Sequence, residues 1–268
     1  MAPMGKGSEQ RPLLQAAGEP QPHEGLKKVS TIPLIFAVQL ATLAWAIQHA
    51  WNHGALTPEE ATRVWAALAL VALWGLVTGV LTYRGFYVSQ GVLASLPAIW
   101  VPLLPVLVCM VPFSLSPTLQ SGVAAVVDAA PPLTFLCLQG VRALAVGSLL
   151  KWRKGLFPTA FAWVVAFPDM LFGASAWLLA AFEVTDGAVS RAVLAAWNVL
   201  GATIIVPVVP VVLQLGLPGL FHVYDPVPSN DLIFEWPMGL APSLVVPLFV
   251  VVNLAVAWRS LRSLPGMA

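Results

Sequence analysis

The sequence predicts an all-α fold, a polytopic transmembrane helix bundle of about seven spans with several proline-kinked helices. Three observations lead to this prediction. Of the 268 residues, 59% are hydrophobic and only 9% are charged, whereas a soluble domain carries about 25% charged residues. Most charges stand near the chain ends or in short connections, which leaves long uncharged runs. Several of these runs reach the roughly 20 residues that a helix needs to cross the hydrocarbon core.

The chain begins with a polar segment, residues 1–28, which is rich in Gly, Pro, Glu, Gln and Lys. Because it has few apolar side chains to bury, we expect a disordered cytoplasmic tail. It also lacks the short apolar core and the cleavage site of a secretory signal. We expect the transmembrane helical domain over residues 29–262 and a short tail over 263–268.

The apolar runs predict seven membrane spans. They cover residues 31–51, 62–83, 90–112, 132–150, 159–182, 190–213 and 238–258. Tryptophans stand near several of their ends, where amphipathic rings favour the headgroup zone. The 113–131 segment is apolar but interrupted by Ser, Pro and Asp128, so we expect an interfacial loop there and no eighth span.

Two patterns predict irregular or closely packed helices. A proline inside a span removes a helix hydrogen bond and favours a kink, although prolines are also ordinary in membrane helices. The G-x-x-x-G pattern at residues 75–79 permits close helix approach, within the protein or between copies. The prolines concerned are Pro97, Pro102, Pro105, Pro242 and Pro247.

The positive charges predict the orientation of the chain. Residues 27–28, Arg84 and the cluster at 151–154 fall on one side if the spans alternate. Lys and Arg favour the cytoplasmic side, so we expect a cytoplasmic N-terminus, in a bacterial cytoplasmic membrane. The last part of the chain conflicts with this pattern. With seven spans, Arg259 and Arg262 would lie outside. An even number of spans would place these two arginines on the cytoplasmic side, in agreement with the rule.

Two formal charges lie deep in the predicted hydrocarbon region, Arg142 in the fourth span and Asp169 in the fifth. A charge there costs roughly 2.5–3.5 kcal/mol on insertion scales, so each should find a partner inside the bundle. Arg142 lies nine residues before Lys151, and Asp169 lies ten after Thr159. At 1.5 Å per residue both lie roughly 13–15 Å from the same surface. We therefore expect an ion pair between two adjacent antiparallel spans.

This pair has a structural and a functional interpretation, and the two are compatible. Arg142 and Asp169 either hold the two helices together or bind a solute, with Asp169 titrating and Arg142 holding an anion. Three amides, Gln139, Asn198 and Asn253, also lie inside predicted spans. Such amides commonly bond across helices as packing contacts, and they are also candidates to line the same polar site.

Two histidines are weak candidates for a metal site. His49 and His53 are four residues apart, so both imidazoles share one helix face, as suits a metal ion. The further ligands at hand are Glu59, Glu60 and the remote His222. We therefore expect no metal site.

The sequence contains no cofactor signature. A bis-histidine haem needs facing mid-membrane histidines, and a retinal Schiff base needs a lysine in a late helix, whereas none follows Lys154. G-x-S-x-G, H-E-x-x-H and P-loop motifs are also missing. A net charge of +1 gives no argument for nucleic acid. Cys109 and Cys137 are expected to be small buried apolar groups, with a disulfide between them as the alternative.

Several short motifs follow one another in the C-terminal half: Arg142, Leu156-Phe157-Pro158, Pro168-Asp169 with Gly173, Trp197-Asn198-x-x-Gly201, and Trp236-Pro237 with Pro242 and Pro247. Through these residues the C-terminal half, about residues 135–262, resembles a family of uncharacterised bacterial integral membrane proteins. The resemblance implies membrane localisation and architecture, without an established activity. Members tend to carry an acidic residue where this chain has Ile204, and a histidine where it has Asn253.

The sequence thus favours a non-enzymatic membrane protein that binds or moves a small solute or lipid headgroup. Its site would be built from Arg142, Asp169 and Asn198, with Gln139 and Asn253 as further candidates. The alternative is a non-catalytic accessory or scaffold subunit, in which these side chains only hold helices together. An enzyme has the least support, because one buried Asp without a second acid, nucleophile or metal set is too little. The bilayer is the one partner indicated, and a homo-oligomer or a membrane complex stays open.

Overall fold

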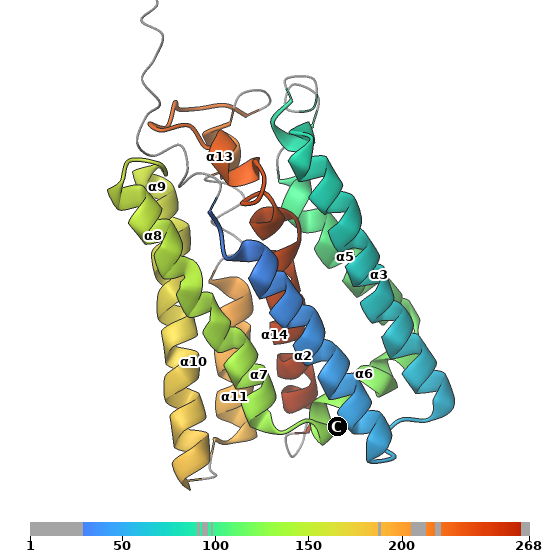
Figure 1. Cartoon of the computed structure of the whole chain (residues 1–268). Helices are drawn as coiled ribbons and strands as arrows, with labels where there is room; N and C mark the ends of the chain where they lie inside the picture. Colours follow the sequence, from blue (N-terminus) through green and yellow to red (C-terminus); the bar gives the residue numbers. More distant parts are fainter. Residues whose placement is uncertain are drawn as a thin grey trace, which may run out of the picture.

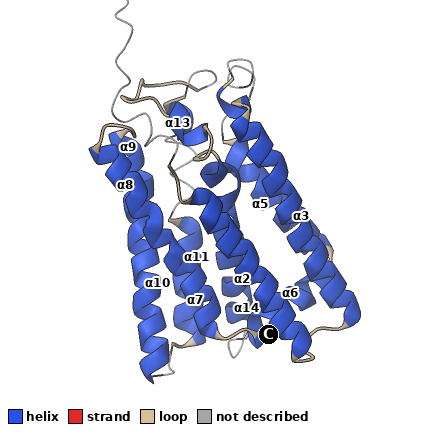
Figure 2. Cartoon of the chain, in the orientation of Figure 1, coloured by secondary structure: helices blue, strands red, loops and turns tan. Residues whose placement is uncertain are grey.

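The computed structural model describes residues 29–89, 92, 96–97, 99–186, 189–204, 213–217 and 221–263. Within these ranges every regular element is a helix, and Figure 2 shows no strand among them. The predicted all-α helix bundle is therefore confirmed. The predicted tail at 1–28 lies outside the described residues, and of the predicted tail at 263–268 only Ser263 is described.

The helices form an elongated bundle with α14 in its middle (Figure 1). In the apolar stretch of Ala241–Arg262, 72% of the residues are buried, against 33% or less in the four other long apolar helices. The elements are α2 (Ile32–Asn52), α3 (Pro58–Tyr83), α5 (Trp100–Leu115), α6 (Pro117–Ala129), α7 (Pro132–Gly140), α8 (Val146–Arg153), α9 (Thr159–Phe161), α10 (Phe167–Asp186), α11 (Arg191–Thr203), α13 (Asp231–Phe234) and α14 (Val246–Arg262).

Three irregular helical segments continue the long helices. The 3₁₀ segment Val141–Ala145 joins α7 to α8, and the π segment Ala162–Ala166 joins α9 to α10. A second π segment, Ala241–Val245, leads into α14. Such segments inside long helices often occur at functional sites, and the first of them holds Arg142.

Five helices among the described residues are long and apolar enough to cross a membrane, or six if a bent pair counts as one span. The five are Ile32–Asn52, Pro58–Tyr83, Pro132–Arg153, Thr159–Val184 and Ala241–Arg262, and the bent pair is α5 with α6. The predicted span 190–213 is described only in part, as the 13-residue α11. The chain is thus a multi-pass helix bundle, and the count of seven spans is not confirmed.

The predicted loop at 113–131 is wrong, because most of this segment is helical. Helix α5 extends to Leu115, and α6 follows at an angle of 107°. Ser116 caps α6 by accepting a hydrogen bond from the backbone N–H of Leu119, and Pro117 occupies the first helical position. Ser and Pro are helix-start residues in this order, so the apparent interruption begins a new helix.

The two ends of the bundle show that α2 and α14 run in the same direction. At one end, Ser30 donates to the sulfur of Met238 at 3.4 Å. At the other end, α6 bridges the start of α3 and the end of α14, because Thr118 donates to Glu59 and Arg259 donates to Asp128. Parallel first and last helices imply an odd number of crossings, which disfavours the even-span alternative.

The two positive charges that conflict with the predicted orientation have partners at this end of the bundle. Arg259 donates through Nε to Asp128 Oδ2 at 2.8 Å, at the end of α6. The guanidinium of Arg262 lies over the ring of Trp258, 4.8 Å from its centroid. Both charges at this end thus have a partner within the protein. The orientation rule counts Lys and Arg regardless of nearby carboxylates, so their conflict with an odd number of spans remains.

The backbone around Pro247, the second residue of α14, is bound by polar side chains of neighbouring helices. Pro247 has no N–H, so α14 itself cannot bond the carbonyl of Ser243, four residues earlier. Trp74 of α3 donates its indole N–H to this carbonyl at 2.9 Å. Gln39 of α2 donates to the carbonyl of Val245 at 3.0 Å. Both donors fix the segment that leads into α14 against α2 and α3.

Replacing Trp74 with Phe should lower the free energy of unfolding by about 1–3 kcal/mol, because it leaves the buried Ser243 carbonyl without its donor. Thermal or denaturant unfolding of the detergent-solubilised protein measures this. Trp65→Phe is the matched control, since Trp65 lies on the same helix and is 37% exposed. The control should change stability by less than about 0.5 kcal/mol. Equal effects of both changes would show that the indole bond contributes nothing.

The G-x-x-x-G face of α3 packs inside the protein. A Cβ at Gly75 would overlap the ring of Phe36 in α2 and lie 3.1 Å from Leu244. A Cβ at Gly79 would touch Leu240 at 4.0 Å. Of the two interpretations of the motif, close packing within one chain is therefore the one observed.

Candidate functional site

The predicted ion pair between Arg142 and Asp169 is present in the bundle. Arg142 Nε donates to Asp169 Oδ1 at 2.6 Å, across the interface between the α7–α8 helix and α10. The Arg142 side chain has no exposed surface, and that of Asp169 is 13% exposed. The two charges meet because Arg142 and Asp169 lie at equal depth in adjacent helices, as the helical rise predicts.

The rest of the Arg142 guanidinium reaches a third helix. Nη1 donates to the carbonyl of Gly201 at 3.2 Å and to Gln139 Oε1 at 3.4 Å. The guanidinium also lies over the ring of Phe172, with Cζ 4.3 Å from the centroid. Gly201 stands in the last turn of α11, where helix carbonyls carry a partial negative charge that attracts a cation. One guanidinium thus connects the α7–α8 helix, α10 and α11.

Three glycines allow the helices around Arg142 to approach one another. A Cβ at Gly173 would overlap the backbone nitrogen of Ala143, so α10 crosses the Arg142 segment with no space for a side chain. A Cβ at Gly201 would overlap the Phe172 ring. A Cβ at Gly140 would lie 2.7 Å from Trp177, which donates its indole N–H to the Gly140 carbonyl.

The three predicted amides differ in how they contact the cluster around the Arg142–Asp169 ion pair. Gln139 belongs to the cluster, because it accepts from Arg142 and donates weakly to the Phe249 carbonyl at 3.5 Å. Asn253 is fully buried beside Gly201, where a Cβ on that glycine would lie 2.6 Å from the Asn253 amide nitrogen. Asn198 donates to Leu194 within its own helix at 2.8 Å, and no hydrogen bond links it to Arg142.

Several polar atoms of this cluster are buried without a hydrogen-bond partner among the described residues. They are Nη2 of Arg142, Oδ1 of Asn198, and both amide atoms of Asn253. Buried polar groups usually have a partner. These atoms are therefore the strongest support for a polar ligand, whereas the complete enclosure of Arg142 is the strongest argument for a structural role.

Sequence reasoning missed the Gly201 carbonyl and the Phe172 ring as partners of Arg142. A backbone carbonyl leaves no signal in residue type, and the position of Phe172 depends on how α10 packs. The glycines of the resemblance did carry a signal, because Gly173 and Gly201 both lie at the closest helix contacts of the cluster.

His49 and His53, the weak candidates for metal ligands, lie next to each other at the end of α2. The rings of His49 and His53 lie 4.1 Å apart, and His53 Nδ1 contacts the His49 carbonyl at 2.8 Å. Within the described ranges, no three His, Cys, Asp or Glu residues come close enough to hold a metal ion.

Both cysteines are free, with Cys109 half-buried and Cys137 exposed. The expected burial of Cys137 is therefore wrong: its side chain points outward from α7.

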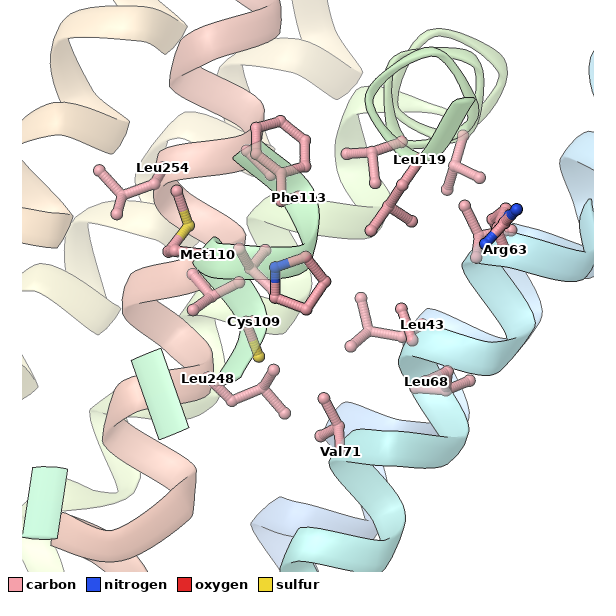
Figure 3. A pocket seen from close by; sticks show the side chains of 18 of the residues that line it. Leu43, Arg63, Leu68, Val71, Cys109, Met110, Phe113, Leu119, Leu248 and Leu254 are labelled. Atoms are coloured by element: carbon pink, nitrogen blue, oxygen red, sulfur yellow. The ribbon is translucent and has the colours of Figure 1, made fainter. Parts of the chain in front are cut away.

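A separate apolar cavity lies on the other side of α14 from the polar cluster. Its volume is about 520 Å³, within the range of roughly 300–1,000 Å³ for small-molecule sites. Its lining comes from α2, α3, α5, α6, α7 and α14. Figure 3 shows these side chains facing one space, with Arg63 and Leu119 at one edge.

The walls of the cavity follow from residue size and spacing. On α3 the lining residues Arg63, Ala67, Leu70 and Val71 recur at helical spacing and therefore share one face. Small side chains such as Ala67 leave the space open. At one end, α6 closes against α3, where a Cβ on Gly122 would lie 2.9 Å from Val64.

The cavity opens between α3 and α5. It is only partly enclosed, and its exposed lining residues are on these two helices: Arg63, Ala66 and Leu70 on α3, and Pro112 on α5. Arg63 is the one formally charged residue among those that line it, with a side chain that is 59% exposed. The cavity is therefore apolar along its length and carries a cation at its rim.

No known protein family, no curated protein and no solved structure matches this chain. The arguments for its function therefore rest on its own residues. Of the residues that carry the resemblance to uncharacterised bacterial membrane proteins, Arg142, Asp169, Gly173 and Gly201 all belong to the polar cluster. At the two departures, Asn253 adjoins the cluster and Ile204 directly follows α11.

Proposed function

We propose that this multi-pass membrane protein binds the apolar chain of a lipid-like amphiphile in the cavity between α3, α5 and α14. One observation carries the proposal, namely a cavity of about 520 Å³ whose lining is almost entirely apolar. An apolar cavity of this kind does not hold water well and takes up apolar ligands instead. Its opening between two apolar helices suits a molecule that arrives from the bilayer.

The chain would bind chiefly by burying its surface and by dispersion contacts with the lining side chains. Apolar burial contributes about 25 cal/mol per Å² when the ligand comes from water. A ligand that comes from lipid gains less, because the acyl region is already apolar, so shape and packing decide the affinity. Binding should therefore depend strongly on the free volume beside Ala67.

Filling the cavity should strongly weaken binding. We expect Ala67→Phe to reduce occupancy roughly five-fold or more, because the added ring takes the volume of the ligand and forces repacking of about 1–3 kcal/mol. The probe is a diazirine-bearing hexadecanol in phosphatidylcholine vesicles that contain the protein. Mass spectrometry then measures cross-links on Cys109 and Met110 of α5, which line the cavity.

The matched control is Ala69→Phe, which adds the same ring two residues away, at an exposed position of α3 that does not line the cavity. It should leave the cross-links unchanged. Unlabelled hexadecanol should displace the probe from Cys109 and Met110, whereas labelling of the exposed Leu178 on α10 by bulk probe should not saturate. Cross-links that do not saturate, or that survive Ala67→Phe, would refute the proposal.

The polar cluster supports a second candidate function. Binding or movement of a small solute or lipid headgroup by Arg142, Asp169, Asn198, Gln139 and Asn253 stays a hypothesis, supported by their unpartnered atoms. The accessory or scaffold alternative draws on another observation, the full enclosure of Arg142 with three protein acceptors. Such an arrangement satisfies the charge without a ligand. We favour the structural role for this cluster.

We also infer that the start of α2 lies on the cytoplasmic side. Arg84 follows α3, and residues 151–154 form the last turn and the cap of α8, so both basic groups belong to the end of the bundle where α2 begins (Figure 1). Lys and Arg near helix ends favour the cytoplasm. This inference supports an N-terminus on the inner face of the membrane, and a bacterial cytoplasmic membrane stays a proposal.

A further inference from the structure

The rim of the apolar cavity holds one cation that the described part of the chain leaves largely unengaged. Arg63 contacts Glu59 at 4.0 Å across one helical turn, which is the limit for an ion pair. Its guanidinium has five N–H donors, and none makes a hydrogen bond to a described residue. An exposed pair at this distance contributes little energy, so a better acceptor can displace Glu59.

The acidic groups beside Arg63 are already bound elsewhere. Glu59 Oε1 accepts a hydrogen bond from Thr118 of α6 at 3.4 Å. Glu60 Oε2 accepts from the backbone N–H and the hydroxyl of Thr57, at 2.9 Å each, in the cap of α3. Both carboxylates thus stabilise the start of α3 and its contact with α6, and neither forms a close pair with Arg63.

The position of Arg63 along α3 suits the headgroup of an amphiphile. It lies five residues after Pro58, the first residue of α3, or roughly 7.5 Å along the helix axis. The apolar lining then continues to Val71, roughly 12 Å further along the same face. A charge near the helix start and an apolar groove beyond it match the two ends of an anionic amphiphile.

We propose that the ligand of the cavity is a single-chain amphiphile with an anionic headgroup, a carboxylate or a phosphate, which Arg63 binds. This inference rests on the proposed function, since it specifies the ligand of the same cavity. The chain lies along the apolar lining, and two oxygens of the headgroup accept paired N–H donors of the guanidinium. Arginine suits this role because its planar fork matches both carboxylate and phosphate.

The experiment compares two competitors that share one chain. Hexadecyl phosphate and hexadecanol each displace the diazirine-bearing hexadecanol from the cavity, in phosphatidylcholine vesicles. In Arg63→Gln, the midpoint for hexadecyl phosphate should rise roughly five-fold, as expected for a partly exposed charge pair. The midpoint for hexadecanol should stay unchanged, and Arg63→Lys, which keeps the charge, should lose less than Arg63→Gln.

Arg84→Gln is the matched control, because Arg84 is an exposed arginine at the opposite end of α3 and does not line the cavity. It should alter neither midpoint. Equal midpoint changes for the two competitors in Arg63→Gln, or none, would overturn the headgroup assignment while leaving chain binding intact. If the probe gives no saturable cross-link in the unsubstituted protein, the proposed function itself fails and the assignment fails with it.

Discussion

Gly173→Ala should destabilise the protein by about 3 kcal/mol or more, one of the two largest single effects that the structure predicts. The new Cβ would overlap the backbone nitrogen of Ala143 and its neighbouring carbonyl carbon. A side chain can rotate away from such a clash, but a helix backbone cannot, so α10 has to move from the Arg142 segment. Overpacking usually costs about 1–3 kcal/mol, and a backbone clash belongs at or above the upper end.

A glycine series measures this effect against its own controls. Gly147 of α8 has no atom within 4 Å of an added Cβ, so Gly147→Ala should be neutral or stabilise by up to about 1 kcal/mol through helix propensity. Gly201→Ala should fall between the two, because it meets the movable Phe172 ring. Thermal unfolding in detergent ranks the three. If Gly173→Ala were as stable as Gly147→Ala, the close crossing of the helices would be wrong.

The arrangement around Arg142 shows what the sequence alone can predict. The helical rise is constant, so residue counts from Lys151 and Thr159 were enough to place Arg142 and Asp169 at equal depth. The partners on α11 and α14 could not be derived in the same way. Which helix lies next to Arg142 depends on tertiary packing, and the Gly201 carbonyl belongs to a backbone that every residue shares.

The cavity could not be predicted from the sequence either, because it also depends on tertiary packing. Its lining combines positions from helices far apart in the chain, such as Ala67 of α3, Cys109 of α5 and Leu248 of α14. Hydropathy marks all of them as membrane residues and does not distinguish a packed face from an open one. The misassigned segment at 113–131 has another cause: Ser116 and Pro117 signal a turn or a helix start, and only the following contacts decide between them.

The strongest test of the polar cluster removes its charges singly and together. Arg142→Ala should destabilise the protein by about 3–5 kcal/mol, because it leaves the Asp169 carboxylate in the membrane interior without its partner. It also removes the donor to the Gly201 carbonyl and the cation over Phe172. Asp169→Asn should cost less, since the guanidinium keeps Gly201 and Gln139 as acceptors. Thermal unfolding and the yield of folded protein measure both changes.

The double variant Arg142→Met with Asp169→Leu decides between a structural pair and a solute site. Apolar replacement of a whole buried ion pair is often neutral or stabilising, so the double variant should recover most of the stability that Arg142→Ala loses. Recovery together with unchanged cross-links in the apolar cavity would show that the charges hold the α7–α8 helix, α10 and α11 in place, and that ligand binding occurs across α14. Single variants that fold normally but lose a ligand-dependent thermal shift would contradict the structural role. In that case the unpartnered atoms of Arg142 and Asn253 would mark a second binding site, and the two faces of α14 would serve different ligands.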